Sequence, residues 1–251
     1  MFTDTLIDVK NNKIIDLLNS WLLINISPEA LTWLQDKQQE VRESAELRKL
    51  FTAFSFVSRC LETQKLNLSS EELNTANNLI TGWNPQDWMV DQIARTLLIL
   101  SFPHQNEDKY VATLDKIFAA ADVREAIALY QSLPLLPYPE RFKLRAAEGV
   151  RSNMTSVFNA VALNNPYPAQ YLDDLAWNQM VLKALFVGSP LQPIYGLNQR
   201  NNEQLCQMLI DYARERLAAK RTVNSELWQL VAPFNPQVAN SLETEFKVVC
   251  C

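Results

Sequence analysis

Hydrophobic residues along most of the chain recur at spacings of three and four, which is the period of an amphipathic α-helix. Segments with this pattern cover residues 4–24, 28–43, 45–61, 87–100, 108–121, 123–133, 140–163, 169–187, 203–220 and 225–230. Apolar and polar residues do not alternate at a period of two over any useful length, as a half-buried strand requires. We therefore predict an all-α protein.

Local signals mark several of the expected helix boundaries. Ser27 and Pro28 suit the cap and the first position of a helix, and Ser69 with Glu72 can form a reciprocal capping box. Three prolines in residues 133–139 prevent a helix from continuing through that connector. The longest predicted helix follows it, over 140–163, with a buried stripe that consists of Ala146, Val150, Met154, Val157, Phe158 and Val161.

Helix starts marked by proline suggest a repeated architecture. They fall at Pro28, Pro85, Pro139 and Pro168, at intervals near multiples of 28 residues. This spacing favours a right-handed multi-helix stack that resembles an α-solenoid of HEAT-like or TPR-like hairpins. We expect a single helical domain over 1–234 and a flexible C-terminal tail over 235–251.

Composition excludes several classes of protein. Only four glycines are present, which disfavours β-rich and dinucleotide-binding folds that depend on positive φ and close backbone approach. The net charge is −5 and no long basic run exists, so a nucleic-acid-binding surface is not expected. The N-terminus lacks the pattern of a secretory signal, and apolar runs fall short of the roughly 20 residues that span a bilayer. We expect a cytoplasmic protein with no direct membrane span.

Cysteine and histidine usage predicts neither a metal nor a cofactor site. Cys60 and Cys206 lie in helical patterns and are expected to be small core residues. The terminal Cys250-Cys251 pair resembles the prenylated end of small GTPases, but the chain has no phosphate loop, and a reactive flexible tail is the favoured interpretation. His104, the only histidine, lies in a loop and is expected to be solvated.

A polar stripe along the 140–163 segment is the first candidate functional site. Its residues recur at helical spacing and are Arg141, Arg145, Glu148 and Ser152, with Arg151 and Asn153 beside them. One interpretation is a solvated helix face, in which Arg145 and Glu148 pair at i, i+3. The other is a face that recognises an acidic partner or an anionic ligand, because arginine binds carboxylate and phosphate with two hydrogen bonds.

The apolar segment 176–197 contains the second candidate. Asn178, Gln179 and Lys183 are embedded in a helix that is apolar on nearly all sides, and Tyr195 follows in a loop. A polar group in such a helix must find a partner, because leaving it unpaired costs about 1–3 kcal/mol. Lys183 either extends to solvent or meets a carboxylate or a bound anion. The nearby Asp173-Asp174 pair is read as stabilising a helix N-terminus.

Four strings resemble the EboA family: "LPLLPYPE" at 133–140, "RAAEGVRSNM" at 145–154, the segment 165–197 and the segment 209–234. The resemblance implies a protein encoded in an ebo gene cluster for a secondary metabolite, beside sugar-phosphate-type enzymes and a membrane protein similar to prenyltransferases. It carries over no catalytic residues. Where the family tends to have Asp-Tyr-Ala-His-Glu-Arg-Trp, this chain has Arg214 in place of the histidine and Leu217 in place of the tryptophan.

Two functional hypotheses follow. The preferred one is a non-catalytic scaffold that supports biosynthesis or export of the metabolite, with other ebo-cluster proteins as partners, including the prenyltransferase-like membrane protein. It expects an exposed groove near Arg141 and Arg145. The alternative is an enzyme or small-molecule carrier with a polar pocket around Arg145, Glu148, Asn178 and Lys183.

Overall fold

The computed structural model describes the backbone of residues 2–249 and the side chains of residues 6–246. This part of the chain contains fourteen α-helices, two 3-10 helices and no β-strand, although one isolated bridge pairs Lys65 with Met89. The all-α prediction is confirmed. The chain divides into two compact units, Met1–Val161 and Ala162–Cys251, whereas the sequence suggested one domain over 1–234. Cys250 and Cys251 lie outside the described residues.

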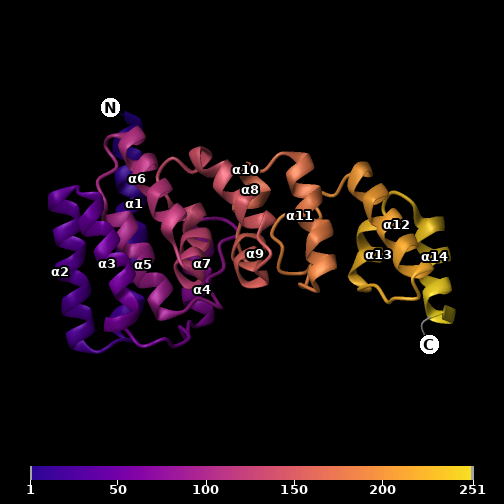
Figure 1. Cartoon of the computed structure of the whole chain (residues 1–251), viewed down its shortest axis with the longest axis horizontal. Helices are drawn as coiled ribbons and strands as arrows, with labels where there is room; N and C mark the ends of the chain where they lie inside the picture. The colour runs from indigo at the N-terminus through magenta and orange to yellow at the C-terminus, as the bar shows by residue number, and fades with distance from the viewer. Residues whose placement is uncertain (1, 250–251) are drawn as a thin grey trace. The chain divides into compact units, whose positions relative to one another are not determined.

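Nine α-helices begin in the first unit (Figure 1). They are α1 (Phe2–Leu23), α2 (Pro28–Ser44), α3 (Leu47–Cys60), α4 (Ser70–Leu79), α5 (Val90–Ser101), α6 (Glu107–Ala120), α7 (Val123–Ser132), α8 (Lys143–Arg151) and α9 (Thr155–Ala162). Two 3-10 helices, η1 (Leu133–Leu135) and η2 (Pro139–Phe142), form the proline-rich connector between α7 and α8. The side chain of Ser27 accepts a hydrogen bond from the Ala30 N–H at the start of α2, and Ser69 and Glu72 form the capping box of α4, as predicted.

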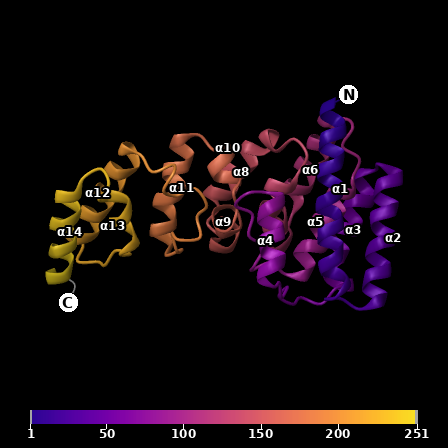
Figure 2. The same cartoon turned by 180° about the vertical axis from the view of Figure 1, so that it is seen from behind.

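The core of the first unit surrounds α5. Residues at eleven of its twelve positions are buried, and α1, α2, α3 and α7 all pack against it. Figures 1 and 2 show α1, α2 and α3 side by side in both views. In a solenoid each hairpin contacts only its neighbours, so the packing in this unit is that of a bundle around a buried helix.

The single helix predicted over 140–163 is wrong. The structure has η2, then α8, then α9, with a break at residues 152–154. Ser152 is extended, and its hydroxyl accepts a hydrogen bond from the Met154 N–H at 3.2 Å, which competes with helix formation. Met154 is consequently 49% exposed instead of buried. Gly149 permits the fold-back, because a Cβ there would lie 2.6 Å from a methyl of Val161 on α9.

The second unit contains α10 (Tyr167–Tyr171), α11 (Asp174–Val187), α12 (Glu203–Ala218), α13 (Glu226–Val231) and α14 (Pro236–Val249). Asp173 caps α11 by accepting the Ala176 N–H at 2.8 Å, in agreement with the helix-terminus interpretation. We expected residues 235–251 to be a flexible tail, but 236–249 form α14, which packs on α12 and α13. The Phe246 ring lies 5.8 Å from the Trp228 ring, and both residues are buried.

The environment of His104 also differs from the prediction. The residue is only 7% exposed, and its Nε2 lies 2.9 Å from the Oδ1 of Asp8 on α1. Its backbone carbonyl accepts a hydrogen bond from the Tyr138 hydroxyl at 2.8 Å. His104 is buried because Asp8 of α1 and Tyr138 of the connector both contact it, and these residues are far from it in the sequence. His104 therefore holds two distant segments together.

Candidate functional site

The arginines of the first predicted site are held by carboxylates of α6. Arg141 forms ion pairs with Glu107 and with Asp108, the latter at 3.1 Å between Nη2 and Oδ1. These hydrogen bonds raise the pKa of Arg141 above its ordinary value. The pair of carboxylates lies in the first turn of α6, so Arg141 joins η2 to the start of that helix.

Arg145 is enclosed more completely. Its Nε donates to Asp115 Oδ1 at 2.7 Å, its Nη1 donates to Glu148 Oε2 at 2.8 Å, and its guanidinium lies 5.6 Å from the centre of the Phe118 ring. Partial burial opposes the charged form, but the hydrogen bonds from these two carboxylates outweigh it and the pKa is raised. The i, i+3 pairing of Arg145 with Glu148 is confirmed.

These contacts fasten η2 and α8 to α6. Arg151 and Asn153, the other members of the predicted site, are exposed near the end of α8. The docking role expected for this stripe stays a prediction. Arg141 and Arg145 already form ion pairs within the protein, and an acidic partner would have to displace these carboxylates or bind beside them.

In the second unit, Asn178 has the partner that its buried position requires. It is fully buried on α11 and exchanges two side-chain hydrogen bonds with Asn202, at 3.1 and 2.9 Å. Asn202 also caps α12 by accepting the Leu205 N–H at 2.9 Å. Asn178 thus aligns α11 with the start of α12. On the same helix Gln179 is exposed, while Lys183 is half-buried and has its pKa lowered by burial.

Tyr195 lines a different part of the second unit. It is half-buried in a cleft of about 470 Å³ between the loop 191–199 and α13. The carboxylate of Glu226 closes one side by accepting the N–H groups of Leu191 and Gln192, each at 3.0 Å. These backbone hydrogen bonds lower the pKa of Glu226 although burial opposes the shift. Lys183 does not line this cleft.

The predicted polar pocket draws on both compact units. Arg145 and Glu148 belong to the first unit, and Asn178 and Lys183 belong to the second. The described contacts of Arg145 and Glu148 stay within the first unit, and those of Asn178 stay within the second. Convergence of all four residues on one pocket stays a prediction.

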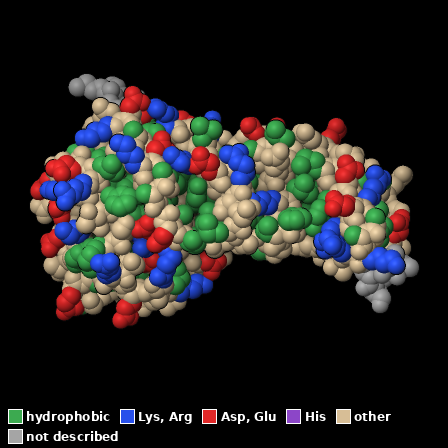
Figure 3. Space-filling view, in the orientation of Figure 1, with side chains coloured by type: hydrophobic (Ala, Val, Ile, Leu, Met, Phe, Trp, Pro, Cys, Tyr) green, Lys and Arg blue, Asp and Glu red, His purple; other side chains and the backbone are tan. Residues whose placement is uncertain are grey.

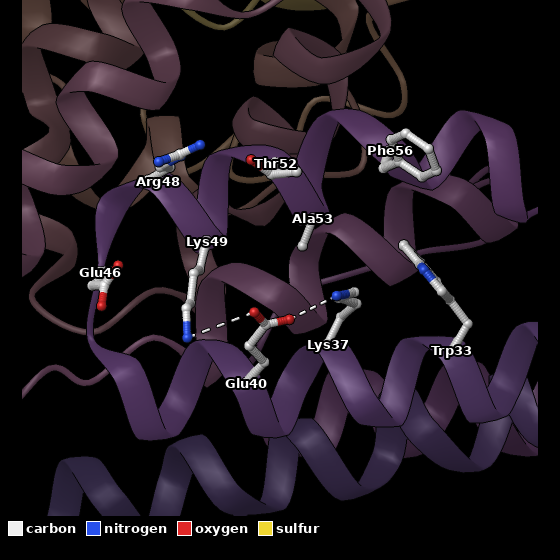
Figure 4. Close-up of a pocket in the computed structure, with 9 residues that line it drawn as sticks. All are labelled: Trp33, Lys37, Glu40, Glu46, Arg48, Lys49, Thr52, Ala53 and Phe56. Carbon is white, nitrogen blue, oxygen red and sulfur yellow. Dashed lines mark hydrogen bonds and ion pairs between the residues drawn. The ribbon is translucent and has the colours of Figure 1, made fainter.

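A groove between α2 and α3 is the candidate site that the sequence did not reveal (Figure 4). It has a volume of about 690 Å³ and opens to solvent along the helix pair. Its lining residues are Trp33, Lys37, Glu40, Glu46, Arg48, Lys49, Thr52, Ala53 and Phe56. Cationic side chains therefore outnumber anionic ones in the groove, although the whole chain carries a net charge of −5.

One carboxylate organises the centre of the groove. Glu40 on α2 lies 2.6 Å from the ammonium of Lys37 and 3.6 Å from that of Lys49 on α3. Figure 4 shows Glu40 between the two lysines. The hydrogen bond from Lys37 is the main reason that the pKa of Glu40 is lowered. Arg48, one residue before Lys49, is exposed and has no ion pair with a described residue.

Aromatic side chains form the other end of the groove. Trp33 is half-buried on α2, and Phe56 on α3 is 42% exposed, with the guanidinium of Arg59 at 4.9 Å from its ring centre. Phe56 follows buried Phe54 by two positions, which is about 200° around a helix and therefore places it on the opposite face. The sequence could have indicated this site through Phe56 alone, because a phenylalanine that lies off the buried stripe of its helix is not needed in the core.

The described part of the chain lacks two features that would have pointed to other functions. No helix there is both long and apolar enough to cross a membrane. Among the same residues, no three His, Cys, Asp or Glu side chains gather as they would around a metal ion. On the face shown in Figure 3, acidic and basic side chains are interspersed with separate hydrophobic patches.

The described residues define an all-helical protein with an open groove between the antiparallel helices α2 and α3. Over residues 14–232 the chain matches the sequence model of the family described as metabolite traffic protein EboA. This match covers most of the chain, and the protein belongs to the EboA family, as the resemblance of its sequence suggested. Neither the curated proteins nor the solved structures include a match. The family description fits a metabolite-related role.

Proposed function

We propose that the protein is a non-catalytic helical scaffold that supports biosynthesis or export of a secondary metabolite encoded by an ebo-type gene cluster. In this proposal it binds another protein of that cluster through the α2–α3 groove. The observation that carries the proposal is the groove itself, which leaves aromatic and cationic side chains open to solvent between two ordered helices.

The chemistry of the groove favours an amphipathic helix as its occupant. Partner helices commonly bind such grooves by placing apolar anchors at helical spacing into them. Trp33 and Phe56 offer an apolar surface for one anchor, and Arg48 and Lys49 offer positive charge about two turns away along α3. A helix with an aromatic or aliphatic anchor at one end and acidic residues at the other would match both features.

The family and the internal arrangement of the first unit support this reading. Membership in a family described as metabolite traffic proteins is compatible with a role in handling a metabolite. The arginines first considered for docking hold α8 on α6, whereas Arg48 has no such intramolecular role among the described residues.

The experiment is site-specific crosslinking with proteins encoded in the same cluster, the prenyltransferase-like membrane protein included. A photoreactive amino acid replaces Thr52, which is exposed in the groove, and a matched one replaces Arg151, exposed on α8. We expect one co-encoded protein to crosslink at position 52 and not at 151, through a peptide with helical spacing of apolar residues. Mass spectrometry of the crosslinked peptides identifies that segment.

Variants then test the two halves of the groove. Phe56→Ala and Arg48→Glu should each weaken binding of the co-encoded protein by about tenfold or more, which corresponds to about 1.4 kcal/mol, and should lower the crosslinking yield when the partner is below saturation. Phe186→Ala, which removes a 77% exposed phenylalanine from α11, and Arg151→Glu should leave it unchanged. Equal losses in groove and control variants, or no crosslink from any co-encoded protein at position 52, would contradict the proposal.

A further inference from the structure

A second cavity of the first unit lies between α1 and the proline-rich connector. Its volume is about 510 Å³, within the range of about 300–1,000 Å³ that is typical of small-molecule sites. The residues around it are Ile7, Lys10, Asn11, Glu107, Leu135, Leu136, Pro137, Tyr138, Pro139 and Glu140. None of these residues lines the α2–α3 groove, so the two sites are separate.

The connector forms a rigid apolar wall of this cavity. Leu135 and Leu136 are 2% exposed and anchor it to the core, and prolines at 137 and 139 restrict the backbone between them. Tyr138 adopts the left-handed conformation, with φ 55° and ψ 52°, which costs a residue with a side chain about 1–2 kcal/mol. Residues held in such conformations cluster at ligand sites because the surrounding structure fixes them in advance.

The contacts of Tyr138 explain how the strained conformation is retained. Its hydroxyl donates to the His104 carbonyl at 2.8 Å, and its ring packs at 6.5 Å from the buried ring of Tyr110. The wall is therefore ordered before any ligand arrives, which lowers the entropic cost of binding.

Lys10 supplies an uncompensated cation. Its side chain is exposed as a whole, yet the surroundings of the ammonium are crowded enough that burial lowers its pKa. It forms no ion pair or hydrogen bond with a described residue, and the two nearby carboxylates do not offset the effect of burial. Of these carboxylates, Glu107 is held by Arg141 and Glu140 is exposed. An anion placed against Lys10 would stabilise its charged form.

Asn11 supplies a buried acceptor without a partner. The residue is 5% exposed, and its Nδ2 donates to the Leu100 carbonyl at 3.0 Å. Its Oδ1 is covered by protein atoms and has no hydrogen-bond partner in the described part of the chain. A buried acceptor left unpaired is costly, and a donor that enters beside it, with a small rotation of the amide, would satisfy it.

We propose that this cavity binds a small organic acid with an apolar body and a hydrogen-bond donor. The acidic group would pair with Lys10, the donor would approach Asn11, and the apolar body would lie against Leu136 and the prolines of the connector. The proposal concerns the isolated protein and does not depend on partner docking at the α2–α3 groove.

The first test uses two fluorescent probes that differ in one charge. The probe 1-anilinonaphthalene-8-sulfonate carries an anion, an N–H donor and an aromatic body, while N-phenyl-1-naphthylamine lacks the anion. The full chain should bind the sulfonate at one saturable site. Lys10→Met should weaken its binding by about tenfold or more, since charged hydrogen bonds contribute that much, and should leave the neutral probe within about twofold.

Two control variants locate the probe. Lys13→Met removes an exposed charge from the same helix, and Arg48→Ala removes the open cation of the α2–α3 groove. Both should leave the binding of each probe unchanged. Ile7→Trp should fill the cavity and abolish the binding of both probes. Displacement of the sulfonate by 1-naphthoate or by 1-naphthyl phosphate then distinguishes a carboxylate ligand from a phosphate.

The proposal would be overturned if the sulfonate showed no saturable binding, or if Lys10→Met and Lys13→Met weakened its binding equally. Loss of probe binding in Arg48→Ala, or retained binding in Ile7→Trp, would place the probe elsewhere. Failure of both 1-naphthoate and 1-naphthyl phosphate to displace the sulfonate would also contradict the proposal. Crosslinking at position 52 measures partner docking independently of these titrations. If probe binding is absent but crosslinking at position 52 is retained, only the proposal of a ligand in the cavity is contradicted. If the probe binds but no partner crosslinks, only the scaffold proposal is contradicted.

Discussion

Two groups of cationic residues in the first unit have opposite surroundings. Arg141 and Arg145 each meet carboxylates on α6, a helix about thirty residues earlier in the chain, and so join segments of the protein. Lys37 and Lys49 share the single carboxylate of Glu40, and Arg48 beside them has no ion pair with a described residue. The more conspicuous cluster in the sequence is therefore paired within the protein, and the less conspicuous one includes a cation without a described ion pair.

The difference shows what a local pattern can and cannot report. The pairing of Arg145 with Glu148 follows from helical spacing and was predicted. The pairing of Arg145 with Asp115 depends on where α6 packs, and the spacing of residues within α8 does not predict it. An arginine in a helical stripe is available for docking only if no carboxylate from another helix reaches it first.

We expect the largest loss of stability when the most deeply buried of these ion pairs is broken, which is the Arg95–Asp91 pair within α5. Arg95 is 1% exposed, and its Nη1 lies 2.6 Å from Asp91 Oδ2. Asp91→Ala should lower the free energy of unfolding by about 3–5 kcal/mol, because it leaves a buried cation without a partner. Urea denaturation of the purified chain measures this loss.

The double variant Asp91→Ala/Arg95→Met sharpens the same test. Removing both charges should recover most of the stability, because the methionine is apolar and of similar length. An equal loss in the single and double variants would show that packing, and not the uncompensated charge, causes the effect.

We expect the second-largest loss of stability when Arg200, an arginine of the second unit that is engaged in several hydrogen bonds, is replaced. Arg200 donates to the carbonyls of Pro168, Ala169 and Leu172 at the end of α10, and it pairs with Asp174 at 2.5 Å. Arg200→Ala should lower the stability of this unit by about 2–3 kcal/mol, since it leaves several carbonyls without a donor. Hydrogen exchange across 166–187 should accelerate, whereas the exposed Arg214→Ala should leave it unchanged.

A smaller effect separates the two arginines of the predicted site. Arg145 is 23% exposed and also covers Phe118, so Arg145→Ala should destabilise the first unit by about 1–2 kcal/mol. Arg141 is 41% exposed, and Arg141→Ala should give a smaller shift in the thermal midpoint because solvent screens its ion pairs. A larger shift for Arg141 than for Arg145 would contradict the ranking by burial.

The smallest effect on stability belongs to the open cation of the groove. Arg48→Ala should leave the thermal midpoint unchanged within error, because the side chain is exposed and has no described ion pair. Partner binding should nevertheless weaken and become less sensitive to salt, since one screened charge is lost. A clear loss of thermal stability in Arg48→Ala would show that Arg48 stabilises the fold, as Arg141 and Arg145 are expected to do, and would contradict the distinction drawn between them.

Helix caps and periodicity predicted the class and many boundaries. Ser27, Ser69 and Asp173 each accept the backbone hydrogen bond that their position suggested, because capping depends only on residues within one turn. The break at 152–154 and the helix at 236–249 were not foreseen. In the first case Gly149 lets α9 fold back on α8, and in the second the stripe Ala239, Leu242 and Phe246 is buried where α14 packs on α12 and α13.

The candidate sites divide in the same way. The sequence indicated that Asn178 needs a partner but not that Asn202, from the N-terminus of α12, supplies it. Neither site now proposed was visible, because the α2–α3 groove depends on how two helices splay. The α1 cavity depends on a connector more than one hundred residues from Lys10.

By itself the sequence determined that the protein is helical, where most helices begin, and to which family it belongs, because these properties rest on hydrogen bonds and residue order within short segments. The tertiary structure alone decided which charges are neutralised and which stay open. An ion pair depends on the distance between two side chains in space, and that distance is set by packing between helices far apart in the chain.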